Sequence, residues 1–539
     1  MLKNLSVIIT VALIFNSCAG VATKNVSPDS YKVPKKYTKK QPMLLRSKMM
    51  KSSTADSMHA PMHQVYSESA VMNTERYDAI KENGFKLSQS SPLSTLSIDV
   101  DTASYTNVLR MIEDEDRMPV KGAVRIEEMI NYFSYDYKEP KAHAKHPFTI
   151  TTEVSQAPWN PNNKLLLVGL KAKTIKKSKL PASNFVALID VSGSMRPSLP
   201  LVKQTLKLLA KKLDKNDRLS IVNYATNIGV TLEPTLGDDY ETIAKAVDSL
   251  VAYGGTNGQA GIDVAYELAR KSFINKGNNR ILMFTDGDFN VGKTSRSEIV
   301  DIVTKERESG VFLSVVGFGR GNYNDSMMEK MADNGNGNYS YVHDLLDAKK
   351  TFDSELVGTL YTLGKDVKFQ LEFNPSQVAS YRLIGYENRL LNAEDFNDDT
   401  KDAGEIGVGH RVTALYELVM SDKKNKNLPK VDALKYQTTT INDESSELAT
   451  IKMRYKKADG KESMLMTTTA KASDIATHNI HFSSAVAGFG MLLRDSAFKG
   501  DLTFSDVIKQ AKAAKGKDDE GYRAAFIKLV EKAELLKQK

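Results

Sequence analysis

Oxygen-bearing side chains occur in three short segments of this sequence, two of which directly follow apolar runs. The segment "FVALIDVSGSM" carries Asp190, Ser192 and Ser194 directly after five apolar residues. Thr256 lies in the glycine-flanked segment "YGGTNGQ", and Asp286 ends the apolar run "RILMFTD". Carboxylate and hydroxyl oxygens are hard ligands, which suit Mg²⁺, Mn²⁺ or Ca²⁺ better than zinc. We therefore expect these five residues to bind a divalent cation, with Mg²⁺ as the favoured ion.

The Asp-x-Ser-x-Ser spacing suits such a site. Alternate residues of an extended segment point to the same side, so the three side chains face one ion. Gly193, between the two serines, lets the backbone bend there. Because hydroxyls are neutral, the ion stays partly unneutralised and attracts a further negative ligand. The expected partner is a protein that presents an acidic group at an open coordination position.

The segment that carries these residues, from 184 to 360, alternates apolar strands with amphipathic helices. This alternation predicts an α/β fold with a doubly wound, mainly parallel sheet that is covered by helices on both faces. Ligands of such sheets bind outside the carboxyl ends of the strands, where the strand order reverses. The first strand of the segment ends at Asp190, so the topology alone predicts a site there.

Two further modules flank the α/β segment. Residues 91–173 predict a small α+β module, with helices at 104–115 and 124–133 and two strands within 148–173. Residues 361–539 predict a β-rich module that is closed by helices near 478–495 and 522–536. Residues 18–90 are rich in Lys, Ser, Pro, Met and Gln without periodicity, which indicates a flexible tether.

The first twenty residues, "MLKNLSVIITVALIFNSCAG", have the charged start, short apolar run and small-residue exit of a secretory signal. The segment "FNSC" resembles a bacterial lipobox, although Phe15 replaces the usual leucine. We therefore expect a signal peptide at 1–17 and lipidation at Cys18. Cys18 is the only cysteine, so an internal disulfide is excluded. A plain cleaved signal is the alternative. We expect a protein of the bacterial cell envelope, lipid-anchored with the outer membrane favoured, whose body lies in the periplasm or at the cell surface.

The basic charge is concentrated beside this anchor. Nine basic residues and one acid lie between Ala19 and Ser53, a net charge of +8 that equals the net charge of the whole chain. A polybasic stretch next to a membrane anchor favours anionic surfaces, although a solvated linker has the same composition. The folded body is near neutral, which argues against a nucleic-acid partner.

The segments "DVSGS", "YGGTNGQ" and "TDG" together resemble the von Willebrand factor type A (VWA) domain with its metal-ion-dependent adhesion site (MIDAS). The resemblance implies that Asp190, Ser192, Ser194, Thr256 and Asp286 hold the metal. Flanking stretches such as "RIEEMINYF" and "PWNPNNKLLLVGLK" resemble one bacterial subfamily of VWA lipoproteins, so the resemblance extends from about 90 to 539.

Other polar residues have plainer interpretations. Asp99 and Asp101 favour helix capping over a second metal motif, and Asp288 either joins the outer shell of the metal or only shapes its loop. The pair His478 and His481 favours a helix start over a zinc site.

The three metal loops contain no histidine, lysine or cysteine to act as base or nucleophile, so we expect no enzyme and no catalytic residues. The favoured function is a lipid-anchored, metal-dependent adhesion or scaffold module. The alternatives are a metal-assisted hydrolase and an accessory subunit of a transport or envelope-maintenance complex.

Overall fold

The computed structural model describes residues 75–98, 101–287, 296–320, 323–354, 357–358, 361–401, 403–421, 445–458, 460 and 462–538. The chain divides into two units, Met1–Ser69 and Ala70–Lys539, and all described residues belong to the second. The predicted signal peptide, Cys18, the basic tether, Asp99 and Asp288 lie outside the described residues. Among the described helices, none combines the length and apolar character needed to cross a bilayer.

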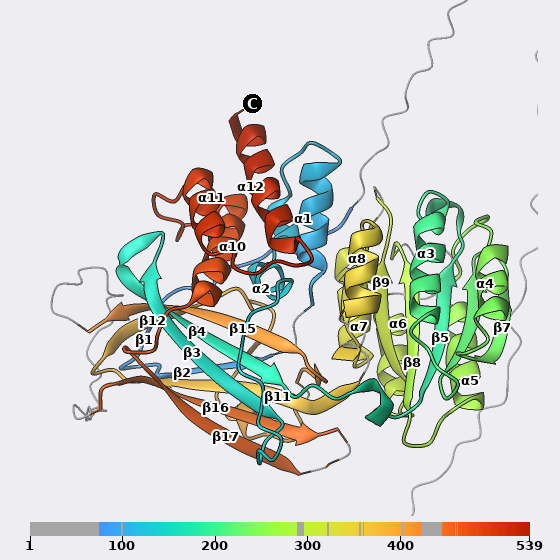
Figure 1. The fold of residues 1–539 in the computed structure, drawn as a ribbon, viewed down its shortest axis with the longest axis horizontal. Coiled ribbons are helices and arrows are strands. Elements are labelled where there is room, and N and C mark those ends of the chain that lie inside the picture. The colour runs from blue at the N-terminus through green and yellow to red at the C-terminus, as the bar shows by residue number, and fades with distance from the viewer. Residues whose placement is uncertain are drawn as a thin grey trace, which may run out of the picture. The chain divides into compact units, whose positions relative to one another are not determined.

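The α/β segment contains a six-stranded sheet with the strand order β10-β9-β8-β5-β6-β7 (Figure 1). Its strands are β5 (Ser183–Asp190), β6 (Arg218–Tyr224), β7 (Ile228–Leu236), β8 (Asn278–Thr285), β9 (Phe312–Gly317) and β10 (Tyr339–Tyr341). Only the edge strand β7 runs antiparallel to its neighbour. The strand that follows β5 in sequence, β6, pairs with one edge of β5, and the later strand β8 pairs with the other edge. The strand order therefore reverses at β5. The mainly parallel sheet with its switch point at Asp190 confirms the sequence prediction.

Helices cover both faces of this sheet, and every residue of the central strand β5 is therefore buried. The side chains of Phe185, Ala187 and Ile189 pack toward a core that includes α3 (Leu199–Ala210), α4 (Tyr240–Ser249) and α8 (Leu345–Lys349). The alternate residues Val186 and Leu188 pack toward a second core with α5 (Gly258–Lys271), α6 (Arg296–Arg307) and α7 (Asp325–Asn334). A π-helical turn, Lys350–Ser354, follows α8.

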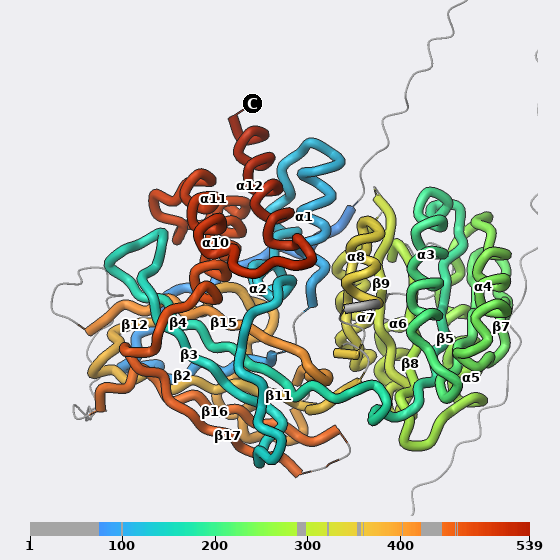
Figure 2. The backbone as a smooth tube through the Cα atoms, viewed as in Figure 1, coloured from blue at the N-terminus to red at the C-terminus, as the bar shows by residue number. Residues whose placement is uncertain are grey.

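Strands from both sides of the α/β segment share two further sheets, with the orders β1-β12-β15-β4-β3 and β13-β2-β11-β16-β17 (Figure 2). The strands before the segment are β1 (Lys86–Leu87), β2 (Leu93–Ser97), β3 (Phe148–Ala157) and β4 (Asn160–Ala172). Those after it are β11 (Thr362–Phe373), β12 (Val378–Ile384), β13 (Leu390–Leu391), β14 (Ile406–Gly407), β15 (Arg411–Met420), β16 (Glu447–Lys457) and β17 (Ser463–Lys471). The two flanks are therefore paired with each other, which the linear division of the sequence into separate flanking modules did not anticipate.

The helices of the two flanks also pack together. These are α1 (Ala103–Glu113), α2 (Ile126–Asn131), α10 (His478–Arg494), α11 (Phe504–Ala513) and α12 (Tyr522–Gln538). They share one apolar core, in which Tyr105 of α1, Phe482 of α10 and Phe526 of α12 are buried. The sequence analysis predicted α1, α2, α10 and α12 but missed α4 and α11. Both missed helices begin at a side chain that accepts a backbone hydrogen bond, Asp239 for α4 and Thr503 for α11.

Candidate metal centre

Asp190 stands at the carboxyl end of the buried strand β5 and is itself fully buried. Its Oδ1 accepts a hydrogen bond from the backbone N–H of Ser192 at 2.9 Å. Its Oδ2 accepts from the hydroxyl groups of Thr285 at 3.1 Å and Tyr224 at 3.3 Å. Each of these partners is neutral, so they orient the carboxylate without cancelling its charge.

The two serines follow in a tight turn. Ser192 precedes a 3₁₀ turn, Gly193–Met195, which brings the Oγ atoms of Ser192 and Ser194 to 3.0 Å from each other. Ser192 is buried, whereas Ser194 is exposed. The turn therefore presents one hydroxyl inside the protein and one at the surface.

The loop that carries Thr256 runs beside this turn. The backbone N–H of Gly193 donates to Gly254 O at 2.9 Å, and the N–H of Tyr253 donates to Val191 O at 2.7 Å. Gly254 has a φ of +80°, which a residue with a side chain rarely adopts. Thr256, two residues further on, is buried. These backbone contacts hold the loop that carries Thr256 beside the Asp-x-Ser-x-Ser turn.

Asp286 follows β8, the strand that runs parallel to β5 with Ile189 opposite Phe284. Asp286 is fully buried. Burial, followed by the negative charge of Asp286, raises the pKa of Asp190 to about 7. Two carboxylates therefore lie close together in a poorly solvated place, where ionising both is costly unless an opposite charge is near.

The donor set fits a hard divalent cation. Asp190 has no cationic side chain among its hydrogen-bond partners in the described part of the chain, and burial and the charge of Asp286 both raise its pKa. Such a cation would relieve the repulsion between Asp190 and Asp286, and hydroxyls such as those of Ser192 and Ser194 are ordinary oxygen ligands for it. The structure thus brings the five predicted residues to one edge of the sheet. Their role as metal ligands stays a prediction.

Sequence reasoning missed Thr285 and Tyr224, which hold Asp190 in place. Thr285 directly precedes Asp286, and Tyr224 ends β6, the other neighbour of β5. Both stand at the carboxyl end of a strand beside β5, so the predicted strand order contained the signal that would have found them.

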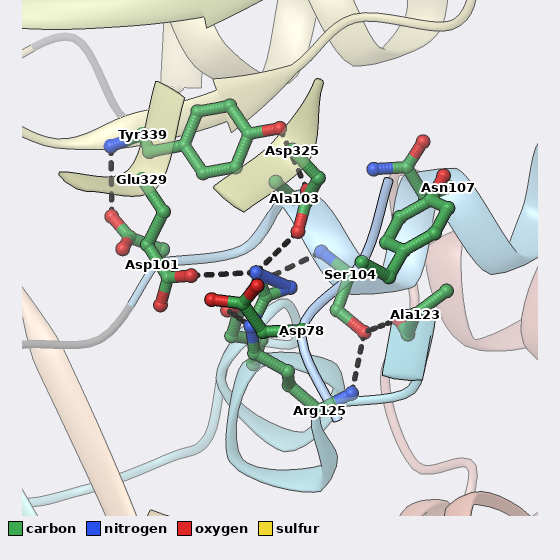
Figure 3. A network of polar contacts seen from close by, with 12 residues as sticks. Asp78, Asp101, Ala103, Ser104, Asn107, Ala123, Arg125, Asp325, Glu329 and Tyr339 are labelled. Atoms are coloured by element: carbon green, nitrogen blue, oxygen red, sulfur yellow. Dashed lines mark hydrogen bonds and ion pairs between the residues drawn. The ribbon is translucent and has the colours of Figure 1, made fainter. Parts of the chain in front are cut away.

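A second acidic cluster lies elsewhere, around Arg125 (Figure 3). Carboxylate oxygens of Asp101, Glu128 and Glu329 lie within 4.8 Å of one another. Arg125 forms ion pairs with Glu128 at 3.2 Å and with Glu329 at 2.7 Å, and it also pairs with Asp325. Arg389 pairs with Asp101 at 3.0 Å. Two guanidinium groups therefore already neutralise much of this cluster, and it is better explained as a structural network than as a metal site.

The predicted capping role of Asp101 is wrong. Asp101 accepts a hydrogen bond from the backbone N–H of Tyr339 at 2.7 Å and from Arg389, and helix α1 has no side-chain cap from its N-cap residue Thr102. Instead, Glu128 accepts from the N–H of Ser104, in the first turn of α1, at 2.8 Å. A carboxylate from another helix thus stabilises the positive end of α1, which no local pattern reveals.

The two histidines begin a helix, as predicted. Helix α10 starts at His478, and the side chain of Thr477 caps it by accepting from the N–H of Asn479. The ring of His478 contacts Asp136 Oδ2 at 3.0 Å.

Comparison with protein families agrees with this architecture. A family model for the von Willebrand factor type A domain matches residues 184–354, and a von Willebrand factor model matches residues 71–167. A model for the C-terminal region of the uncharacterized protein YfbK matches residues 358–536. The α/β segment with the candidate metal centre is therefore a VWA domain.

Comparison with individual proteins identifies the family to which the chain belongs. YfbK of Escherichia coli (strain K12) is 44% identical over 472 residues, which cover 86% of this chain and 81% of YfbK. The protein sll0103 of Synechocystis is 27% identical over 188 residues, which cover 35% of this chain and 44% of that protein. Because the YfbK match spans most of both chains, this chain belongs to the family of YfbK-like VWA proteins.

Solved structures resemble the chain more distantly. A von Willebrand factor type A protein from Catenulispora acidiphila is 13% identical, with coverage of 70% of this chain and 88% of its own and a TM-score of 0.38. BatB from Bacteroides thetaiotaomicron is 23% identical, with coverage of 32% and 97% and a TM-score of 0.27.

Proposed function

We propose that this protein is a divalent-metal-dependent protein-binding module, an adhesion or scaffold protein that acts through the MIDAS-type site of its VWA domain. Asp190, Ser192, Ser194, Thr256 and Asp286 would hold the cation, with Mg²⁺ favoured and Mn²⁺ or Ca²⁺ also suitable. The observation that carries the proposal is the carboxylate of Asp190, whose described hydrogen-bond partners are all neutral and whose pKa is raised by burial and then by the charge of Asp286.

The exposed end of the site supports a role in binding. Ser194 is open to solvent while Asp190, Ser192 and Asp286 are buried, so an ion held here would face outward at one side only. If the aspartates accept hydrogen bonds from waters on the ion, its direct ligands are the neutral hydroxyls, which leave it with attraction for one more acidic group. A carboxylate of a partner protein has the chemistry to supply it.

We also propose that the protein is not an enzyme. The groups around Asp190 are hydroxyls and backbone N–H groups, and each described bond to Asp190 positions its carboxylate. A metal-assisted hydrolase would need a general base or nucleophile beside the ion. That function, and a role as accessory subunit of a transport or envelope-maintenance complex, remain the alternatives.

The proposed location is the bacterial cell envelope, with lipidation at Cys18 as the anchor. Support comes from the sequence "FNSC" and from the basic stretch that follows it. An anchored, outward-facing metal site suits a partner in the same envelope.

The test is co-purification from membranes of wild-type protein and the Asp190→Ala variant, each in Mg²⁺ and then in EDTA. Asp238→Ala is the matched control, because Asp238 is an exposed residue of the loop after β7 and lies away from the carboxyl ends of the parallel strands. We expect a partner protein that is retained by wild type and by the control in Mg²⁺, and lost on chelation or in Asp190→Ala.

Binding of Mg²⁺ alone is measured in parallel by calorimetry. A partner that survives both chelation and the Asp190→Ala substitution would overturn the proposal and move the binding surface to the flanking sheets. Hydrolysis of a test ester or phosphoester that depends on Mg²⁺ and Asp190 would favour the enzyme instead.

A further inference from the structure

A polar cavity of about 410 Å³ lies at the opposite end of strand β8 from the metal centre. Its lining includes Arg280 near the start of β8, the turn after α7, and the residues around β13 and β14. Arg280 lies in β8 and Asp286 directly follows that strand, six residues further along, which places the cavity about 20 Å from the candidate metal centre. The cavity is therefore a separate site.

Arg280 is the unusual member of the lining. It is only 1% exposed, and its guanidinium donates one hydrogen bond, from Nη1 to Ser314 Oγ at 2.7 Å. The group also lies over the ring of Phe312, 5.5 Å from its centre. Its buried Nε has no hydrogen-bond partner, and among the described residues no carboxylate lies within ion-pair distance of its guanidinium.

A buried cation without a counter-ion is costly, because burial removes the water that would stabilise its charge. This cost shows as a pKa of Arg280 lowered to about 10, with burial as the main cause. Other buried arginines of the described residues have several acidic or carbonyl partners: Arg125 pairs with three carboxylates, Arg382 pairs with Glu417 at 2.6 Å, and Arg523 donates to three backbone carbonyls. Arg280 thus stands out as a buried guanidinium that lines a cavity and forms no ion pair, although the negative charge of Glu405, which lines the same cavity, offsets part of the cost of its burial.

The other polar groups of the cavity suit an uncharged, hydroxyl-bearing remainder of a ligand. Four asparagines line the cavity: Asn334, Asn336, Asn338 and Asn388. The amides of Asn334, Asn336 and Asn388 already form hydrogen bonds within the protein, but an amide offers two donor and two acceptor positions, so each keeps some for a ligand. The lining acids are engaged within the protein, since Asp333 pairs with Arg389 at 3.0 Å and Glu405 accepts from Thr362 at 2.6 Å.

We propose that this cavity binds a small hydroxyl-bearing oxyanion, a sugar acid or a sugar phosphate, whose charged group pairs with Arg280. A guanidinium matches the planar oxygens of a carboxylate or phosphate, and such charge-assisted bonds are strongest where water is excluded. The shared chemistry of the two ligand classes is the oxyanion on a polyhydroxyl body, and the asparagine amides fit that body.

The probes are glucose 6-phosphate, glucuronate, inorganic phosphate and glucose, each titrated into the full chain at constant ionic strength. Calorimetry gives the affinity and thermal unfolding gives the stabilisation. We expect glucose 6-phosphate or glucuronate to bind, inorganic phosphate to bind more weakly, and glucose not to bind. The preference between the first two distinguishes a phosphate from a carboxylate ligand.

Two variants remove the anion partner in different ways. Arg280→Met deletes the charge while keeping an apolar side chain in its place. Asn338→Asp adds a carboxylate next to Ser314, whose Oγ accepts from the backbone N–H of residue 338 at 3.2 Å, so that an internal acid competes with the ligand. Each variant should weaken binding of the charged probe by about tenfold or more.

The matched control is Arg218→Met. Arg218 begins β6 at the same end of the sheet but is not part of the cavity lining. The Arg218→Met variant should bind the charged probe with the affinity of wild type. The Asp190→Ala variant should also keep that affinity, because the cavity is separate from the candidate metal centre.

Absence of binding by all four probes at about 10 mM would overturn the proposal. Equal affinity for glucose and glucose 6-phosphate, or unchanged affinity in Asn338→Asp, would also overturn it. If Arg280→Met fails to fold, Asn338→Asp still decides the outcome.

Discussion

The hydroxyl of Thr285 links the two strands that carry the candidate metal centre. It donates to Asp190 Oδ2 at 3.1 Å, at the end of β5, and accepts from the backbone N–H of Gly287 at 3.0 Å, just after β8. Asp286 lies between Thr285 and Gly287 in the chain. A single side chain therefore fixes the direction of one carboxylate and the backbone next to the other.

Replacing Thr285 should weaken metal binding without touching a proposed ligand. In Thr285→Val the shape of the side chain is kept and both hydrogen bonds are lost. Residues that orient metal ligands typically contribute about tenfold or more to affinity, so we expect a loss of about tenfold in Mg²⁺ affinity. The measurement is Mg²⁺ titration by calorimetry.

The control for this variant is Thr304→Val. Thr304 also uses its hydroxyl within the VWA domain, donating to Val300 O at 2.8 Å, but it lies in the middle of α6. Both variants should lose about 1–2 kcal/mol of unfolding free energy, while only Thr285→Val loses affinity. Equal Mg²⁺ affinity in the two variants would refute the positioning role of Thr285.

The loop of Thr256 gives a second prediction, through Gly254. A Cβ at this position would lie 2.4 Å from Thr226 Oγ1, and its φ of +80° is strained for any residue with a side chain. Because Gly254 O accepts the N–H of Gly193, the displaced loop should pull away from the Asp-x-Ser-x-Ser turn.

We therefore expect Gly254→Ala to lower Mg²⁺ affinity and to destabilise the domain by about 1–3 kcal/mol. Gly84→Ala is the control, since its Cβ would meet no atom within 4 Å. Unfolding in urea and Mg²⁺ titration measure the two effects. A wild-type affinity in Gly254→Ala would show that this loop does not help to form the site.

Local patterns could predict which residues meet at the candidate metal centre because each of its parts is local. Asp190 and Asp286 end apolar strands, and parallel strands bring their carboxyl ends to one edge. The pairing of β4 with β15 was not predictable in this way, since Leu167 meets Leu415 across almost 250 residues of sequence. The network around Arg125 was hidden for the same reason: its acids come from α2 and α7, far apart in the chain.

That network should contribute strongly to stability. Arg125 is buried and forms ion pairs with Glu128, Asp325 and Glu329. Arg125→Met would leave these buried carboxylates without their main counter-ion, and we expect a loss of about 3–5 kcal/mol of unfolding free energy. The comparison is Arg454→Met, which removes a more exposed pair with Asp399 and should cost less than about 1 kcal/mol. Equal losses in urea unfolding would contradict the assignment of a buried structural network.

The last prediction concerns Asp347 of α8, a buried carboxyl whose stability contribution depends on pH. Burial, followed by the negative charge of Asp344, raises the pKa of Asp347 to about 7, despite hydrogen bonds from Tyr132 at 3.0 Å and from the N–H of His343 at 3.2 Å. The ordinary pKa of an aspartic acid is about 4. Between these two values the folded state holds a proton that the unfolded state has released, so stability falls as pH rises from about 4 to about 7.

Asp347→Asn replaces the ionisable group by one that stays neutral and should remove this slope. Three pKa units correspond to roughly 4 kcal/mol, so the variant should gain up to that amount relative to wild type between pH 4 and pH 8. Urea unfolding in EDTA at several pH values measures the difference, and Asp238→Asn reports the effect of removing an exposed carboxylate. The substitution also removes a carboxylate acceptor, which changes the unfolding free energy by the same amount at every pH. Only the pH dependence of the difference between the variant and wild type therefore reports the ionisation of Asp347. A difference that stays constant from pH 4 to pH 8 would mean that Asp347 ionises as easily in the folded protein as in the unfolded chain, and that burial beside Asp344 does not retain its proton.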